Sequence, residues 1–436
     1  MVLFYLIFFL LMIGYAVLIA YYHRAWNDIP YFGRIATGST VLSGKTDRVQ
    51  DSFLTDPSLP PVPASTTLVV PATIALAVPA TTTLSVPATT VSVVIALRNE
   101  SQNILRLIES LEGQDYPKEL TEIILVDDHS TDNTWQLMQG KSESNYLKAF
   151  QLSASTAIQS GAFKKHAISL GIAKSRGELI VTTDADCSFE PGWLSTIVSF
   201  YLASGNIFIA APVRYSVPVS GTENVLSIFE KLDFITLQGI TGASVYRRFH
   251  TMCNGANLAY KKDVFLQVAG FEDIDHIPSG DDMLLMYKIH KKYPRQVSYL
   301  KASEAIVTTA GTGSWAAFLN QRIRWSSKAI HYDDKRIFWI LLMVYLLNVS
   351  FLIAAIASFF KTNYFIFFLL MLSAKVLIEF PFVNSVAMFF GQQRLMRYFP
   401  FMQPLHILYT IVAGWLGRFG SYQWKGRKIV NHGNRT

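Results

Sequence analysis

The sequence has little cysteine and few charged residues for its length. Cys187 and Cys253 are the only cysteines among its 436 residues. No metal-ligand spacing surrounds them, so we expect neither a disulfide framework nor a zinc site, and we interpret both as buried thiols on a reducing side. Charged residues make up 16% of the chain and hydrophobic residues 51%. This balance is too apolar for a soluble protein and too polar for an all-helical transporter, and it predicts one soluble domain with several membrane spans.

The chain also lacks the strong basic charge of a typical nucleic-acid-binding protein. Its formal net charge is +7, which is modest, and basic residues beside apolar runs usually reflect membrane orientation. We therefore expect membrane lipid as a partner and no nucleic acid.

The first segment, residues 1–24, begins with an apolar run without a charged side chain that is long enough to cross a bilayer. A cleaved signal peptide is the alternative, but the run has no basic start, is too long, and has no Ala-x-Ala site before Tyr21. Positive charge follows the run at His23 and Arg24. This pattern predicts a transmembrane helix with its N-terminus outside and the next domain in the cytosol.

Residues 25–90 are polar and irregular, and they end in a Pro-Ala-Thr repeat. Prolines recur every eighth residue at Pro63, Pro71, Pro79 and Pro87. This spacing forbids a helix, and the Thr and Val content favours extended chain. We expect a flexible linker, with edge strands laid on the next domain as the alternative.

From residue 91 to residue 335 the pattern is that of an α/β domain. Apolar runs at 91–97, 123–126 and 179–183 predict buried strands, and amphipathic segments between them predict helices. Further segments predict a strand at 207–212 and helices at 225–238 and 283–289. Strands that alternate with helices indicate a mostly parallel sheet, which binds ligands at the carboxyl ends of its strands.

Residues 336–418 contain three apolar stretches, at about 337–360, 364–390 and 398–416. The second carries Lys375 and Glu379 one helical turn apart, so the two can pair and should face protein rather than lipid.

The orientation of these stretches raises a conflict. Three full crossings from a cytosolic domain would place the basic tail, residues 419–436, outside. We therefore predict that one stretch, the last and Pro-interrupted one, is interfacial or re-entrant and that the tail is cytosolic.

The α/β domain contains four polar motifs. Three are acidic: Asp127-Asp128 and Asp184-Ala185-Asp186 follow predicted strands, and Asp281-Asp282 opens a predicted helix. The fourth, Gln321-Arg322-Ile323-Arg324-Trp325, precedes the apolar region. Alone, each has an ordinary explanation: turn formation, helix capping, or an amphipathic helix that meets lipid headgroups.

In their order and setting, these motifs resemble the membrane-bound family 2 glycosyltransferases, which include the cellulose, chitin and hyaluronan synthases. The resemblance is close over residues 91 to about 330. It implies a GT-A (Rossmann-like) catalytic domain that transfers a sugar, with inversion, from a nucleotide-diphosphate donor for which UDP is the expected nucleotide. Such a reaction uses Mg²⁺ or Mn²⁺ on hard oxygen ligands and a general base for the acceptor hydroxyl.

The resemblance also assigns roles residue by residue. Asp282 matches the catalytic base, and Asp184 and Asp186 match the metal-binding pair. The matching donor-binding residues are Ala96, Arg98, Glu100, Asp127, Asp128, Lys164, Asp184, Arg322 and Arg324. Those assigned to the acceptor side are Gly255 and Asn257, in a loop that flanks the donor sugar, together with Gln321 and Trp325.

The sequence departs from the family pattern at two of these motifs. Asp281 stands where the family usually has Glu, and the residues after Lys164 differ from the family's lysine motif.

The resemblance implies a multi-pass protein of the cell membrane with a cytosolic catalytic domain. The acceptor is a growing polysaccharide or a lipid-linked sugar: the Gln-x-x-Arg-Trp motif favours processive synthesis, whereas the few C-terminal spans favour single transfer. An alternative is a catalytically silent scaffold subunit of a polysaccharide export complex, against which the intact acidic motifs argue.

Overall fold

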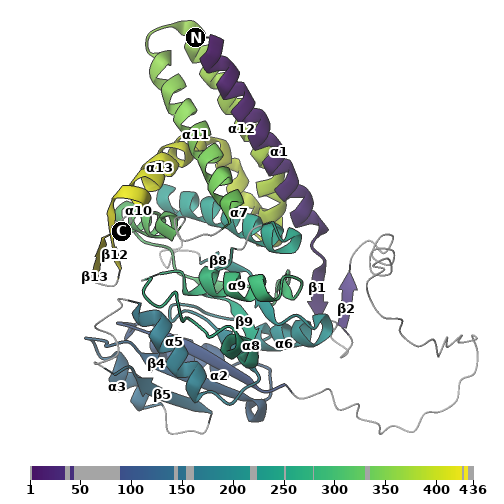
Figure 1. The fold of residues 1–436 in the computed structure, drawn as a ribbon, viewed down its shortest axis with the longest axis vertical. Helices are drawn as coiled ribbons and strands as arrows, with labels where there is room; N and C mark the ends of the chain where they lie inside the picture. Colours follow the sequence, from purple (N-terminus) through teal and green to yellow (C-terminus); the bar gives the residue numbers. More distant parts are fainter. Residues whose placement is uncertain are drawn as a thin grey trace, which may run out of the picture.

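A sheet-containing domain and a bundle of long helices form the two ends of the molecule (Figure 1). This computed structural model describes residues 2–34, 40–43, 89–141, 146–153, 162–216, 223–249, 252–277, 279–328, 334–424 and 427–430. The Pro-Ala-Thr repeats lie outside the described residues, so the linker prediction for them stays a prediction.

The domain is built on a seven-stranded sheet with the order β10-β7-β9-β6-β3-β4-β5. Its strands are β3 (Val91–Leu97), β4 (Thr121–Asp127), β5 (Leu147–Gln151), β6 (Leu179–Thr182), β7 (Phe208–Ala210), β9 (Leu258–Lys261) and β10 (Val297–Tyr299). All neighbouring pairs are parallel except those that β9 makes with β6 and β7. The predicted α/β domain with a mostly parallel sheet is therefore confirmed.

The central strands are buried on both faces, which explains their continuous apolar runs. Every residue of β4 is buried, and β3 is buried except for partly exposed Ala96. Helices cover the two faces: α2 (Ile104–Glu112), α3 (Thr134–Gln139), α5 (Phe163–Lys174), α6 (Trp193–Ser204), α8 (Lys262–Gln267) and α9 (Asp281–Lys292). A parallel pair, β8 (Val213–Tyr215) and β11 (Val307–Thr309), extends the domain towards the bundle.

Two helices join the domain to the bundle. The first, α7 (Val225–Arg247), is longer than the expected 225–238 because small and apolar residues continue its buried faces against α1 and α12. The second, α10 (Trp315–Ser326), carries the basic-aromatic motif and packs on α13. Both lie between the sheet and the long helices in Figure 1.

Among the described residues, three helices are long and apolar enough to cross a membrane. They are α1 (Val2–Asp28), α11 (Lys335–Ser358) and α12 (Thr362–Phe389). The last apolar stretch forms α13 (Phe399–Phe419), which does not meet the same criterion and lies across the lower part of the bundle (Figure 1). This finding supports the interfacial assignment of that stretch, which stays a prediction.

The predicted pairing of Lys375 with Glu379 is confirmed. The two form a buried ion pair on α12. Gln403 of α13 donates a hydrogen bond of 2.7 Å to Glu379, and the hydroxyl of Tyr15 on α1 donates another. The pair thus faces protein, because a charge in hydrocarbon needs partners.

The start of the expected linker is structured. Helix α1 continues to Asp28 rather than ending at residue 24, and β1 (Tyr31–Arg34) follows it. The Phe32 amide donates a 2.9 Å hydrogen bond to the Lys301 carbonyl, so β1 ties α1 to the domain. Strand β2 (Thr40–Ser43) pairs with β1. In the tail, β12 (Ser421–Trp424) and β13 (Arg427–Val430) form an antiparallel pair.

Candidate active site

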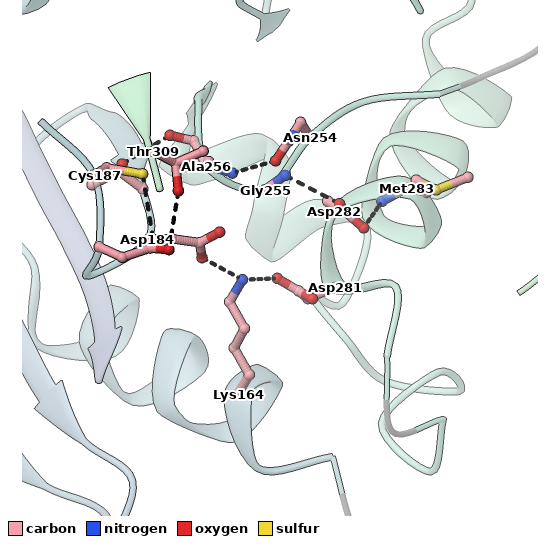
Figure 2. Close-up of polar contacts among 12 residues, drawn as sticks. Lys164, Asp184, Cys187, Asn254, Gly255, Ala256, Asp281, Asp282, Met283 and Thr309 are labelled. Carbon is pink, nitrogen blue, oxygen red and sulfur yellow. Dashed lines mark hydrogen bonds and ion pairs between the residues drawn. The ribbon is translucent and has the colours of Figure 1, made fainter. Parts of the chain in front are cut away.

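The acidic motifs meet at the carboxyl ends of the central strands. Leu97, the last residue of β3, pairs with Asp127, the last residue of β4, and β6 ends just before Asp184. Helix α9, which begins with Asp281, lies across from them (Figure 2). Parallel strands present their ligands at this edge, so the predicted clustering is explained by the sheet topology.

Lys164 is the centre of the cluster. Its ammonium nitrogen lies 2.8 Å from an Asp184 oxygen and 3.0 Å from an Asp281 oxygen, and it bridges the two carboxylates (Figure 2). Burial lowers the pKa of Lys164, but the charges of Asp184, Asp281 and Asp282 outweigh burial and hold it above its ordinary value. Lys164 therefore stays charged and joins β6 to α9.

The two aspartates at the start of α9 have different partners. Burial raises the pKa of Asp281, but Lys164 and Lys328 outweigh burial and hold it well below its ordinary value. The Asp282 carboxylate accepts hydrogen bonds from the amides of Gly255 at 3.1 Å and Met283 at 2.8 Å. Asp282 thus binds the amide of the next residue and the loop before β9, whereas Gly280 is the N-cap of α9 and no side chain caps this helix.

Gly255 lies where a larger residue would not fit easily. A Cβ atom at this position would lie 3.3 Å from the Lys164 nitrogen and 3.4 Å from an Asp281 oxygen. The glycine therefore permits close approach of its loop to the acidic cluster, and its place beside the donor sugar stays a prediction.

Asp184 and Asp186 fit a divalent cation. The Asp184 side chain is 37% exposed, so it is open to a ligand. Asp186 accepts a 3.0 Å hydrogen bond from the Thr309 hydroxyl, which orients it. No group of three acidic, histidine or cysteine side chains suited to a metal occurs among the described residues. Two carboxylates suffice for Mg²⁺ when substrate phosphates and water supply the remaining ligands.

The residues expected at the nucleotide lie along β3 and β4. Asp127 is fully buried and accepts weak hydrogen bonds of 3.3 Å from the Ser130 amide and 3.2 Å from Gln151. Asp128 lies 3.1 Å from the His129 ring. Ala96 is partly exposed one residue before the end of β3. The structure brings these residues to the same edge of the sheet as Asp184 and Asp186, the candidate metal ligands.

Arg98 and Glu100 have structural partners at this edge. Arg98 donates hydrogen bonds of 2.8 and 3.0 Å to the backbone carbonyls of Asp128 and His129. Glu100 accepts a 2.7 Å hydrogen bond from Asn103. Both side chains therefore shape the loops that follow β3 and β4, and a direct contact with the nucleotide stays a prediction.

Arg322 is not placed to grip a diphosphate. Its side chain is 3% exposed and forms a 2.5 Å ion pair with Asp233 of α7. Its guanidinium also stacks at 4.4 Å over the rings of Phe318 and Trp325. The prediction for Arg322 is corrected: a buried guanidinium committed to a buried carboxylate holds α10 on α7, and releasing it would leave Asp233 unpaired.

The other polar and aromatic residues of the motif are less buried than Arg322. Arg324 and Trp325 are partly exposed, and Trp325 packs on Phe234. Gln321 accepts hydrogen bonds from the Tyr215 hydroxyl at 3.2 Å and from Arg322 at 2.5 Å. Arg322 and Arg324 are two residues apart on a helix, so their side chains point in different directions. Of the two arginines, Arg324 remains the candidate for binding the donor diphosphate.

Asn257 also needs correction. Its side chain is fully buried: it donates 2.8 Å hydrogen bonds to the carbonyls of Pro212 and Ala305 and accepts one of 3.1 Å from Trp193. An amide with these three bonds has little capacity left for an acceptor sugar. Asn257 instead joins β9, α6 and the segment before β11.

Sequence reasoning missed Lys328 and Thr309. Lys328 lies 3.5 Å from Asp282, and Thr309 binds Asp186. No motif marks either residue. The position of Lys328 shortly after the basic-aromatic motif was the one available signal. The two cysteines, by contrast, are buried as expected.

Comparison with known proteins agrees with this geometry. Residues 92–267 match the model of glycosyl transferase family 2. The chain contains a family 2 glycosyltransferase domain. This domain includes β3 to β9 and the Asp127, Asp184 and Gly255 motifs, whereas Asp282 and α10 lie beyond the matched range.

Individual relatives share part of their length with this chain. The glycosyltransferase AglE of Haloferax volcanii is 28% identical over 44% of this chain and 59% of the relative. The poly-beta-1,6-N-acetyl-D-glucosamine synthase of Staphylococcus epidermidis is 25% identical over 57% of this chain and 56% of the relative. The chain thus matches a little over half the length of these curated relatives.

A solved structure shares the fold. The mannosyltransferase PcManGT of Pyrobaculum calidifontis, solved with GDP-Man and Mn²⁺, aligns with a TM-score of 0.50 at 16% identity. The alignment covers 75% of this chain and 87% of that chain. The predicted GT-A-like fold is therefore confirmed.

Proposed function

We propose that this protein is a membrane-bound, inverting glycosyltransferase that uses a nucleotide-diphosphate sugar, with UDP as the expected nucleotide. The observation that carries the proposal is the polar cluster at the carboxyl edge of the sheet, in which Lys164 bridges Asp184 and Asp281, and Asp282 follows Asp281. The family match and the GT-A-like fold support it.

The donor lies, in this proposal, along the ends of β3, β4 and β6. Asp127 and Asp128 face the base. Asp184 and Asp186 would hold Mg²⁺ or Mn²⁺, which would supply positive charge beside the leaving diphosphate. Lys164, already held beside Asp184, adds a second positive charge near the phosphates. Arg324 binds the diphosphate from α10, and Trp325 offers an indole face to the acceptor sugar.

Transfer is a single displacement at the anomeric carbon. Asp282 accepts the proton of the acceptor hydroxyl, and the hydroxyl oxygen forms a bond to the anomeric carbon. The bond from that carbon to the diphosphate oxygen breaks, and its electron pair leaves with the nucleoside diphosphate. The amides of Gly255 and Met283 orient the Asp282 carboxylate for this step.

In this proposal, the long apolar helices keep the reaction beside the bilayer. If α1, α11 and α12 cross and α13 lies at the interface, the domain and the tail share the cytosolic side. The acceptor is then a polysaccharide or a lipid-linked sugar that reaches α10 from the bundle, close to Trp325. The product length made by purified protein separates processive synthesis from single transfer.

Nucleotide release from a panel of donors tests the proposal. Purified protein is incubated with UDP- and GDP-sugars, with a membrane extract as acceptor source, and with or without Mg²⁺ or Mn²⁺. We expect release with one donor class that requires the cation and is lost in Asp186→Asn. No release with any donor would favour a silent scaffold subunit.

A further inference from the structure

The adjacent carboxylates of Asp281 and Asp282 face two different lysines. Lys164 comes from α5 and lies 3.0 Å from Asp281. Lys328 comes from the turn that continues α10 and lies 3.5 Å from Asp282. The acidic pair therefore lies between two cations supplied by separate elements, and only the first belongs to the nucleotide side of the site.

The Lys328 contact is well shielded from water. The Lys328 side chain is 9% exposed and the Asp282 side chain 13%. The lysine stem passes Gly280, where a Cβ atom would lie 3.6 Å from the Lys328 Cδ and where φ is +80°. A buried ammonium needs a carboxylate partner to stay charged, so each member of this pair depends on the other.

Lys328 also belongs to the same chain segment as the proposed ligand-binding residues of α10. It lies two residues after the end of α10 and four residues after Arg324. The Lys328–Asp282 contact therefore connects the helix that carries Arg324 and Trp325 to the start of α9.

We propose that Lys328 is a positioning residue for sugar transfer: its contact with Asp282 holds the carboxylate in register with α10, so that the base is ready only when α10 is in place. This inference rests on the proposed function, because it assigns Lys328 a part in the same reaction.

Other charged groups near Asp282 are committed elsewhere. Lys164 bridges Asp184 and Asp281. Lys165, also on α5, donates to the backbone carbonyls of Ile274 and Ile277. Among the described residues, Asp281 and the buried Cys253 thiol are the other titratable groups beside this pair. Within the described residues, Lys328 is the cation that makes an ion pair with Asp282.

The test compares three lysine variants of the full-length protein in a nucleotide-release assay. We expect Lys328→Met to lower kcat about 10- to 100-fold with little change in donor KM. Lys328→Arg keeps the charge and should restore most of kcat. Lys291→Met, a matched change at an exposed position on α9, should behave as wild type. A wild-type kcat in Lys328→Met would overturn the proposal.

Thermal unfolding tests the contact independently of activity. The loss of Tm caused by Lys328→Met is measured in the wild-type and the Asp282→Asn backgrounds. Pairing predicts a clearly smaller loss when Asp282 is already neutral. Equal losses would show that Lys328 acts through packing alone and would overturn the proposal. A wild-type protein that releases no nucleotide would instead defeat the proposed function, and the unfolding result would still stand.

Discussion

Lys164 and Lys165 are adjacent at the start of α5 but bind different kinds of partner. Lys164 lies between two carboxylates, which raise its pKa. Lys165 is almost fully buried and donates to two backbone carbonyls, and burial lowers its pKa to about 8. The first lysine therefore serves the site, whereas the second holds the loop before α9 in place.

A substitution that removes the carboxylate of Asp282 tests its proposed role as the general base. Asp282→Asn keeps the size of the side chain but cannot accept the acceptor proton, so we expect kcat to fall about 10²- to 10⁴-fold. Nucleotide binding, measured by calorimetry, should persist. Asp273→Asn is the control, because Asp273 is exposed and has a positive φ that asparagine also tolerates. An active Asp282→Asn enzyme would remove Asp282 from the mechanism.

The lowered pKa of Glu122 allows a prediction of how the stability of the fold depends on pH. Burial raises the pKa of Glu122, but hydrogen bonds from Lys148, Ser92 and the Arg176 amide outweigh burial and lower it to about 2. A carboxylate whose pKa is lower in the folded than in the unfolded protein stabilises the fold at pH values above its unfolded pKa, which is near 4.5 for Glu122. This stabilisation is lost as the pH falls towards 2.

We therefore expect the Tm of wild type to fall more steeply than that of Glu122→Gln between about pH 4.5 and pH 2. Glu119→Gln, an exposed neighbour, serves as the control and should follow wild type. Parallel curves for wild type and Glu122→Gln would contradict the role of Glu122.

At the scale of elements, one face of α10 anchors the helix to its neighbours, and another presents the residues proposed to bind ligands. One face holds Arg322, paired with Asp233, whose other oxygen accepts a hydrogen bond from Tyr409 of α13. The other part of the helix presents Arg324 and Trp325 with partial exposure. The buried network fixes the position of α10 against α7 and α13, and thereby sets where the exposed residues point.

Two arginine variants test this division. Arg322→Ala leaves Asp233 buried without its cation, so we expect it to destabilise the fold by about 3–5 kcal/mol. Arg324→Ala should leave the Tm almost unchanged and raise the donor KM about tenfold or more, since a hydrogen bond to a charged group is worth about 1.5–3 kcal/mol. Thermal unfolding and donor titrations measure both. The reverse pattern would show that Arg322 is the donor ligand.

At the scale of the whole molecule, the helix bundle determines which ends share a side. The N-terminus lies at the same end of the bundle as the turn between α11 and α12 (Figure 1). Contacts of Tyr5 with Tyr364 and Phe367 agree with this arrangement. Three crossings by α1, α11 and α12 would then place the domain and the tail together.

Cysteine labelling tests this topology directly. The native cysteines are buried, so a membrane-impermeant maleimide reports on introduced ones. We expect Lys361→Cys, between α11 and α12, to react in intact cells, and Ser421→Cys, after α13, to react only after permeabilisation. Reaction of Ser421→Cys in intact cells would mean that α13 crosses the membrane.

Local pattern was sufficient for much of the fold. Strands β3, β4, β6 and β7 and the long apolar helices were predictable because buried strands and membrane helices need continuous apolar residues. Strands β5, β9 and β10 were not predicted. The acidic motifs were predictable as a cluster because parallel strands end at one edge. The ends of α1 and α7 were not, because apolar residues alone do not show where a helix leaves its neighbours.

The sequence by itself determined the domain type, the number of long apolar segments and the acidic edge at β4 and β6. Only the tertiary structure decided which polar side chains face that edge. Arg322 and Asn257 lie within the same motifs as Arg324 and Gly255, yet each has a buried partner set supplied by distant elements. Lys328 has no motif, yet it meets Asp282. Contacts between residues far apart in the chain depend on how helices pack, and that packing leaves no local signature.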